Sequence, residues 1–287
     1  MNIPVIEIDS PGLGISIQDR GRIGWRRFGV PPSGCMDEHA ALWANRLLDN
    51  PADAALLELQ FQGAELAFLQ NAWIALTGAD LGCNVPLWRA VHVSEGDVVR
   101  FPQNRVGLWC YMAIEGGFAS ESIFGSKSAY PRGQLGGSLR ASDLLARTTL
   151  HCFSLPAGVS GRTVPWSEHR DYTKPAPLRV WPGPQWNSFA PAQHDCFFAT
   201  DWRVTSQSDR AGYRLSGPAL EPKPPEIVSE PVRVGSVQVP ENGQPIVTMR
   251  DGPTVGGYPK IGWIDARDLS WLAQCRPGQK VRFRLAE

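Results

Sequence analysis

The sequence predicts a mainly β protein, and three observations support this fold class. Glycine and proline are frequent, with 29 and 25 of the 287 residues, which is high for a helical enzyme. Short apolar runs recur along the chain, and most are bounded by Gly, Pro, Asn or Asp. Helical periodicity is confined to two short segments. Together these features are typical of barrels or sandwiches whose strands are joined by tight turns.

The expected strands begin with "VIEIDS" near the N-terminus and end with "KVRFRL" near the C-terminus. Each has alternating or continuous apolar residues, as half-buried or fully buried strands do. Between these two lie "GISIQD", "LLELQFQGAELAFL", "AWIALTG", "VVRF", "GLWCYMAIEGG", "LRVWPG", "WRVTS", "YRLSG", "GSVQVP", "QPIVTM" and "GWIDA".

Two short helices are expected to pack on this β framework. In "DEHAALWANRLLDNP", Asp37 is placed to cap the first turn and Pro51 follows the last one. In "DARDLSWLAQCRPG", Asp265 is the expected cap and Pro277-Gly278 the stop signal.

The length suggests one large domain or two medium ones. Three segments place a turn directly before an apolar strand, which indicates two similar β units, and a polar, Pro-rich span follows the first half. We therefore predict an N-terminal unit at 1–155, a linker at 156–177 and a C-terminal unit at 178–287, with elements that can interleave.

The composition favours a small-molecule or neutral partner. Lys plus Arg and Asp plus Glu both number 28, so no net charge favours nucleic acid or an anionic membrane. Six widely spaced cysteines form no C-x-x-C pair. The N-terminus lacks the pattern of a signal peptide, and no apolar run is long enough to span a bilayer. We expect a cytoplasmic protein.

Several common catalytic and binding motifs are missing or incomplete. The "GSKS" segment at 125–128 lacks the spacing of a P-loop, and "AYP" follows where a phosphate-binding helix should begin. No G-x-S-x-G occurs, and the five histidines show no metal-ligand spacing, so we predict no metal. Biotin carriers present their lysine beside methionine; because no Met-Lys dipeptide occurs, the chain is not itself a carrier.

A long irregular loop, "QDRGRIGWRRFGVPPSGCMDEHA" at 18–40, is the first candidate site. Glycines and prolines stiffen it, and it carries several fixed charges and a serine, including Arg27, Ser33 and Asp37. Such a loop builds a site or is a solvated connection whose arginines pair with acids, and the sequence leaves both interpretations open. Asp80 in "LTGADLG" follows an apolar strand and is either a site residue or an ordinary turn aspartate.

The second candidate is "SVQVPENGQPIVTMRDGPTVGGYPKIG" at 236–262. We expect Gly256 and Gly257 to adopt backbone angles that other residues avoid, and Pro259 to restrain the chain before Lys260. Lys260 is then a fixed cation on a loop between two strands. Taken without any wider context, the same lysine is a solvated turn residue.

Several stretches resemble one family. The segments "PGLGISIQDRGRIGWRRFGVPPSGCMD", "ALLELQFQGAELAF", "ALTGADLG", "GPQWNSF", "SDRAGYRLSG" and 235–262 are similar to the biotin-dependent carboxyltransferase-related family. Its members include the C subunit of bacterial 5-oxoprolinase, the KipI antagonist, allophanate hydrolase subunit 2-like proteins and part of urea carboxylase. The resemblance covers nearly the whole chain in the expected order.

The resemblance implies a fold of two cyclophilin-like β-barrel units. It implies an ATP-dependent complex with a KipI-like subunit and a lactam-utilisation-type subunit, which hydrolyses 5-oxoproline to glutamate; the ATP site is expected outside this chain. Two alternatives stay open: carboxyl transfer from carboxybiotin to urea, with no biotin attached here, and regulation of a KipI-like protein by binding alone.

The family motifs assign roles to ten residues. The resemblance implies catalytic roles for Lys260 and Arg27, as clamps on a developing oxyanion, and for Asp37; either Asp37 or Asp80 is the carboxylate that handles the proton. The residues expected to bind substrate are Ser33, Asp80, Gln238, Thr254, Gly256, Gly257 and Tyr258.

Three departures from the family pattern put the substrate in question. Lys127 stands where the family often has arginine, Ser142 replaces a glycine, and Pro253 occupies a position that is usually polar.

Overall fold

A computed structural model describes residues 3–148 and 158–287. About 33% of the chain is strand and 14% is helix, which confirms a mainly β fold with a few short helices. The fold includes a nearly closed β-barrel sheet. The chain divides into two compact units, the first made of Met1–Arg22 and Ser33–Thr173 and the second of Ile23–Pro32 and Lys174–Glu287.

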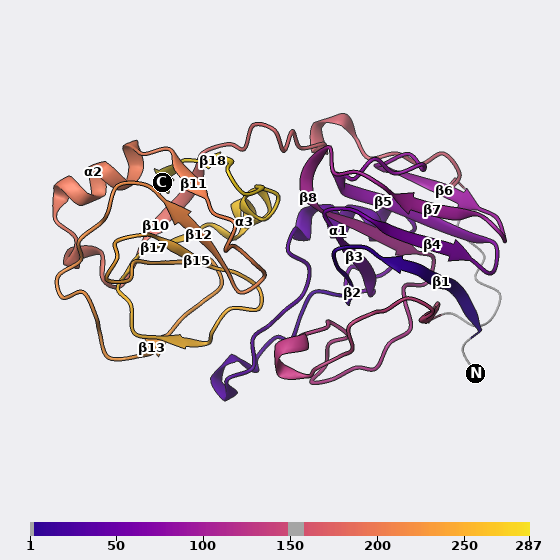
Figure 1. The fold of residues 1–287 in the computed structure, drawn as a ribbon, viewed down its shortest axis with the longest axis horizontal. Helices are drawn as coiled ribbons and strands as arrows, with labels where there is room; N and C mark the ends of the chain where they lie inside the picture. Colours follow the sequence, from indigo (N-terminus) through magenta and orange to yellow (C-terminus); the bar gives the residue numbers. More distant parts are fainter. Residues whose placement is uncertain (1–2, 149–157) are drawn as a thin grey trace. The chain divides into compact units, whose positions relative to one another are not determined.

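The first unit is built on two antiparallel sheets (Figure 1). One has the strand order β7-β4-β1-β9, and the other has the order β2-β3-β8-β5-β6. The strands are β1 (Pro4–Pro11), β2 (Ile15–Gln18), β3 (Leu56–Gln60), β4 (Ala64–Phe68), β5 (Ala72–Asp80), β6 (Arg89–Val93), β7 (Val98–Phe101), β8 (Val106–Ile114) and β9 (Leu144–Ala146).

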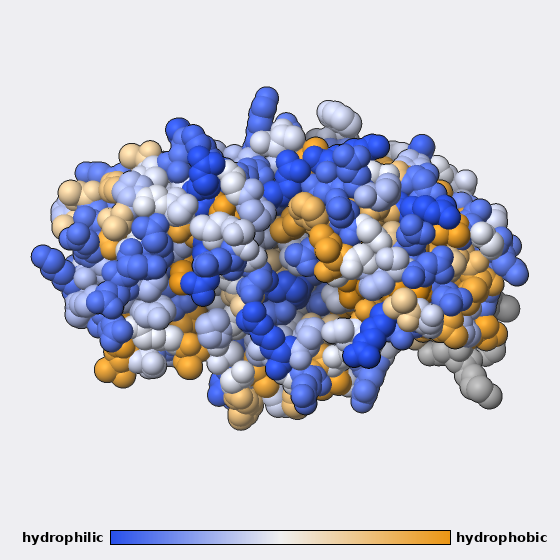
Figure 2. Space-filling view, viewed as in Figure 1, coloured by the Kyte–Doolittle hydropathy of each residue, from blue (hydrophilic) through white to orange (hydrophobic). Residues whose placement is uncertain are grey.

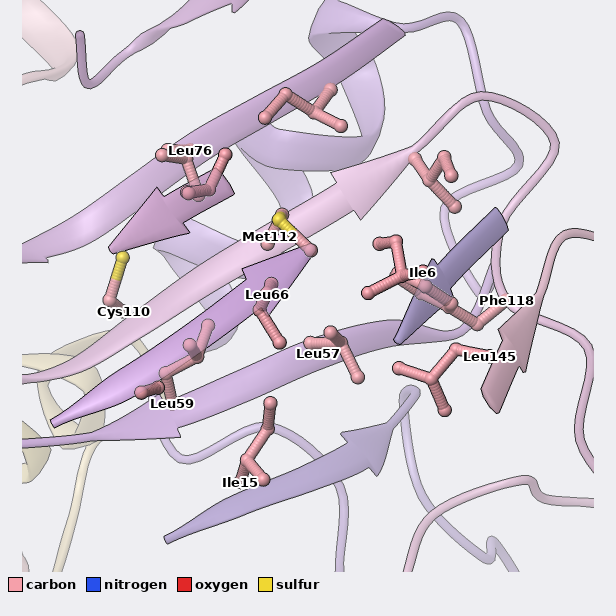
Figure 3. Close-up of a cluster of buried hydrophobic side chains, with 14 of the residues drawn as sticks. Ile6, Ile15, Leu57, Leu59, Leu66, Leu76, Cys110, Met112, Phe118 and Leu145 are labelled. Atoms are coloured by element: carbon pink, nitrogen blue, oxygen red, sulfur yellow. The ribbon is translucent and has the colours of Figure 1, made fainter. Parts of the chain in front are cut away.

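Apolar side chains from both sheets form the core of the first unit (Figure 3). Alternation along β4 is clear, because Ala64, Leu66 and Phe68 are buried while the residues between them are partly exposed. Ile6 of β1 and Met112 of β8 are fully buried in the same cluster.

Helix α1 (Glu38–Leu47) covers β5 and β8. It begins as the sequence predicts, because the Asp37 side chain accepts a hydrogen bond from the backbone N–H of Ala40. Its buried residues lie on one face and include Ala40, Ala44 and Leu47.

The second unit contains an eight-stranded sheet with the order β18-β11-β12-β15-β14-β17-β10-β19. Its strands are β10 (Leu178–Pro182), β11 (Trp202–Val204), β12 (Gly212–Ser216), β14 (Ser236–Gln238), β15 (Ile246–Thr248), β17 (Lys260–Ile264), β18 (Lys280–Val281) and β19 (Phe283–Leu285). Neighbours are antiparallel except β10 and β19, which pair in parallel. A separate ribbon pairs β13 (Glu230–Pro231) with β16 (Val255–Gly256).

Two α-helices belong to the second unit. Helix α3 (Ala266–Ala273) is the predicted one, and Asp265 caps it by accepting the backbone N–H of Arg267. Helix α2 (Pro191–Ala199) was not predicted, because its sequence shows no apolar stripe at helical spacing. In the structure, Phe197 is its single buried residue.

Short 3-10 helices complete the secondary structure that the described residues show. They are η1 (Arg26–Phe28), η2 (Pro131–Gly133), η3 (Trp166–Glu168) and η4 (Trp186–Ser188).

The division differs from the predicted boundaries in three places, and one is that residues 174–177, expected as linker, belong to the second unit. Residues 158–173, expected as linker, belong to the first unit, where the buried Tyr172 donates its hydroxyl to Asp37 Oδ2 at 2.9 Å. Residues 23–32, expected in the N-terminal unit, belong to the second. The predicted boundary at 155 and the first two linker residues lie outside the described residues.

No helix in the described ranges is long and apolar enough to cross a membrane. Figure 2 shows hydrophilic side chains over much of the visible face, with hydrophobic ones scattered between them.

Candidate functional site

The second unit contains a cleft of about 960 Å³. Its walls come from β10, β17, the β13–β16 ribbon and the short helix η1. The described residues that line it include four basic side chains and no acidic one: Arg26, Arg27, Arg233 and Lys260. Apolar walls surround these charges and include Pro182, Val255 and Trp263. A cleft with this lining favours a small anion that also has an apolar face.

Lys260 is the most buried of these cations, with its side chain 4% exposed. It is the first residue of β17, so the expectation of a loop position was wrong. Its Nζ lies 2.5 Å from Glu230 Oε1 as an ion pair, and the described residues give this ammonium no other polar partner. Because a buried ammonium carries three N–H donors, this arrangement leaves donors for an oxygen atom of a ligand.

A closed ring of contacts holds Lys260. Its backbone N–H donates to Gln185 Oε1 at 3.1 Å, and Gln185 Nε2 donates to Glu230 Oε1 at 2.9 Å. The ion pair between Glu230 Oε1 and Lys260 Nζ closes the ring. Contact with Lys260 lowers the pKa of the Glu230 carboxyl. Sequence reasoning missed both partners, although Gln185 stands in the family-like stretch "GPQWNSF".

The two neighbouring arginines differ in their surroundings. Arg26 donates from Nη2 to the carbonyl of Val232 and, at 3.3 Å, to that of Pro253. It therefore ties the two edges of the ribbon, and burial lowers the pKa of its guanidinium. Arg27 is exposed, lines the cleft and lies over the ring of Phe28, 4.7 Å from its centroid. The predicted pair Arg27 and Lys260 thus borders one cleft.

The glycines near Lys260 act differently from the prediction. Neither Gly256 nor Gly257 has a φ in the left-handed region. They lie in closely packed surroundings instead, because a Cβ on Gly256 would lie 2.7 Å from Gln238 Oε1, and one on Gly257 would lie 3.1 Å from the Ile227 carbonyl. The expectation of unusual backbone angles was therefore wrong.

Of the other predicted binding residues in this segment, one lines the cleft and two do not. Thr254 lines the cleft. Gln238 is buried and donates to Thr248 Oγ1 at 2.9 Å, so its side chain supports the strand pair β14–β15. Tyr258 is 39% exposed and is not part of the lining.

Ser33, Asp37 and Asp80 belong to the first unit. Asp37 is fully buried, and its oxygens are used by the α1 cap and by Tyr172. Asp80 accepts the Gly82 N–H at 2.8 Å. Ser33 has a φ of 54°, and its buried Oγ has no hydrogen-bond partner among the described residues. Their participation in the chemistry stays a prediction.

The "GSKS" segment is occupied by a carboxylate of the chain itself. Asp19 accepts the Ser126 and Ser128 hydroxyls, both at 2.6 Å, and the backbone N–H of Lys127 at 2.6 Å. These donors are therefore already bound and do not face a phosphate. Within 3–148 and 158–287, no group of three or more His, Cys, Asp or Glu side chains is arranged to hold a metal ion.

Comparison with known proteins gives consistent matches along the chain. Residues 28–285 match the family described as "Carboxyltransferase domain, subdomain A and B". The chain is 34% identical to the C subunit of 5-oxoprolinase from Haemophilus influenzae, covering 93% of this chain and 87% of the relative. It is also 34% identical to the corresponding Escherichia coli protein, covering 97% and 90%.

A solved structure shows the same fold. The crystal structure of the Kluyveromyces lactis urea carboxylase superposes with a TM-score of 0.89 at 27% identity. The match covers 99% of this chain but only 27% of that enzyme, so the chain corresponds to about a quarter of it.

Proposed function

Because the chain belongs to the carboxyltransferase domain family, we propose that it is the C subunit of an ATP-dependent 5-oxoprolinase complex. The other members of this complex are a KipI-like subunit and a lactam-utilisation-type subunit, and the complex hydrolyses 5-oxoproline to glutamate. One observation carries the proposal: the 34% identity to the C subunits of two 5-oxoprolinases extends over 87% and 90% of their lengths.

The lining of the cleft is chemically suited to this substrate. 5-Oxoproline carries a carboxylate and a lactam carbonyl on a small ring with apolar faces. We assign the carboxylate to the arginines that line the cleft, since guanidinium groups bind carboxylates well. The ring packs against the apolar walls, which include Trp263.

Lys260 is assigned to the lactam carbonyl. When water attacks that carbon, negative charge develops on the carbonyl oxygen and the C–N bond then breaks as the nitrogen takes a proton. An ammonium that is already fixed in a low-dielectric wall stabilises the oxyanion more than the neutral carbonyl. Arg27 can assist from the same cleft.

ATP is assigned to the complex and not to this chain. The single segment with P-loop-like composition has its hydroxyls and a backbone N–H bound to Asp19. No step of the chemistry assigned to this chain passes through ATP.

Carboxyl transfer is the second candidate, and the fold match to urea carboxylase favours it. In that reaction carboxybiotin on a separate carrier would enter the cleft, and the cations would stabilise the transferred carboxylate. Regulatory binding to a KipI-like protein is the third candidate and needs no chemistry in the cleft.

A reconstituted complex separates the three candidates. Glutamate release from 5-oxoproline is measured with ATP, in the presence and absence of this chain. The proposal predicts release only when the chain and ATP are both present. An activity that requires a biotinylated protein and is abolished by avidin would indicate carboxyl transfer. Glutamate release that does not change when the chain is omitted would leave regulatory binding as the remaining candidate.

A further inference from the structure

We propose that Glu230 is a positioning residue that keeps the Lys260 side chain charged and in place, and that Gln185 locks Glu230 in this position. The assignment of Lys260 to a reacting oxygen rests on the proposed function, but the positioning of its ammonium can be tested without any substrate.

The geometry ties three elements together at one oxygen atom. Glu230 Oε1, on the ribbon strand β13, receives the Gln185 amide at 2.9 Å and the Lys260 ammonium at 2.5 Å. Gln185 directly precedes η4, and it accepts the N–H of the first residue of β17 through its own Oε1. Both ends of the amide are therefore used, so the carboxylate has little freedom to leave the lysine.

The charges around Lys260 show why this carboxylate matters. Of the described groups that line the cleft or contact Lys260, three are guanidinium groups and Glu230 is the carboxylate: Arg26, Arg27, Arg233 and Glu230. Without Glu230, the charged side chains that the described residues place around this cleft would all be positive. Burial and like charges both favour the neutral amine, which cannot stabilise an oxyanion as a cation does.

Glu230 is better suited to positioning than to proton transfer. Its pKa is lowered by the contact with Lys260, and a general base works best when its pKa is near the working pH. Its Oε1 is occupied by two donors, so its effect on the reaction passes through the lysine.

The experiment measures the reactivity of Lys260 in the full chain. Amines are labelled with a reagent that attacks only the neutral form, at about pH 8, and each lysine is followed by mass spectrometry. Glu230→Gln keeps the shape and removes the charge. Glu226→Gln is the matched control, because Glu226 is an exposed carboxylate on the same segment and does not line the cleft.

Glu230→Gln should raise the labelling rate of Lys260 at least about tenfold, because the carboxylate that favours the charged form of the amine is lost. The rate should stay within about twofold in Glu226→Gln, and Lys223, which is exposed, serves as the internal reference in every sample. An unchanged Lys260 rate in a folded Glu230→Gln variant overturns the proposal.

Two further variants keep the test decisive. If Glu230→Gln does not fold, Gln185→Met is used; it leaves the carboxylate but removes its lock, and should raise the labelling rate by at least about threefold. Glu230→Asp keeps the charge and should restore most of the protection. Rates equal to wild type in Gln185→Met, or no protection in Glu230→Asp, contradict the proposal.

The reconstituted complex supplies an independent readout. Glu230→Gln should lower kcat at least about tenfold with KM changed by less than about threefold, since Lys260 is assigned to the transition state. If the wild-type complex releases no glutamate, the proposed function fails, while the labelling result still decides the role of Glu230.

Discussion

Lys260 combines features that rarely occur together in a purely structural lysine. Its side chain is almost fully buried, and the Glu230 carboxylate is the one polar contact of its ammonium among the described residues. An ammonium has three N–H donors, so an oxygen atom of a ligand can accept one that the carboxylate does not use.

At the residue scale, the sequence identified Arg27, Thr254 and Lys260, which border one cleft, through motifs shared with the family. It did not identify Glu230, because this residue is one of three glutamates in a Pro-rich stretch and belongs to no recognisable motif. It also favoured Arg27 over Arg26, since adjacent arginines cannot be ranked by burial before the fold is known.

Arg27 provides a prediction about substrate binding. Arg27→Gln should raise KM for 5-oxoproline at least about fivefold, because a guanidinium that binds the carboxylate is lost. Its exposure means that the melting temperature should stay within about 2 °C. Arg284→Gln, an exposed arginine on β19 of the same unit, is the control and should leave KM unchanged. Equal KM values for both variants would remove Arg27 from the site.

At the element scale, the strands and capped helices were predictable because their signals are local. Asp37 and Asp265 cap α1 and α3 as expected. The ribbon β13–β16 was not predictable, because each strand has two residues and its pairing joins Glu230 to Gly256 across a long loop. That ribbon forms part of the cleft wall together with β10, β17 and η1, so one wall of the site could not be predicted.

The pairing of β10 with β17 leaves no room for a side chain at Gly262, which lines the cleft. A Cβ at this position would clash with Val180 Cγ1 and would lie 2.6 Å from the Trp181 carbonyl. Gly262→Ala should therefore destabilise the protein by about 1–3 kcal/mol in urea unfolding. Gly137→Ala, where the added Cβ meets no described atom within 4 Å, should change stability by less than about 0.5 kcal/mol. Similar stability of the two variants would contradict the packing described for these strands.

The α3 cap predicts how stability depends on pH. Hydrogen bonding from Arg267 lowers the pKa of Asp265 below its usual value of 3.8. A carboxyl whose pKa is lower in the folded state stabilises the fold above the usual value, and this contribution is lost as the pH falls below it. The melting temperature should therefore drop more steeply below about pH 4 in wild type than in Asp265→Asn. Parallel curves for the two proteins would show that this carboxylate does not contribute.

At the scale of the whole molecule, two β units and their approximate order along the chain could be expected from the sequence. The assignment of residues 23–32 to the second unit could not, because it depends on long-range contacts such as the hydrogen bond from the Arg26 side chain to the Val232 carbonyl, more than two hundred positions away. The contacts of Asp37 could not be predicted in full either, because Tyr172 lies far from it in the sequence. In the fold its oxygens serve a helix cap and Tyr172.

The family match and the cleft together support one account of the molecule. The second unit supplies a preformed group of cations, of which Lys260 is held by a ring of contacts. The ATP-dependent part of the reaction belongs, in the proposed function, to the partner subunits. In this account the chain contributes transition-state stabilisation and not only assembly.

The most direct test is the turnover of Lys260→Met in the reconstituted complex with 5-oxoproline and ATP. Lys223→Met, which removes an exposed lysine, is the control. The account predicts that Lys260→Met keeps its melting temperature within a few degrees, still assembles, and releases glutamate at least about tenfold more slowly, which corresponds to about 1.4 kcal/mol of transition-state stabilisation. Wild-type turnover by an assembled Lys260→Met complex would contradict it.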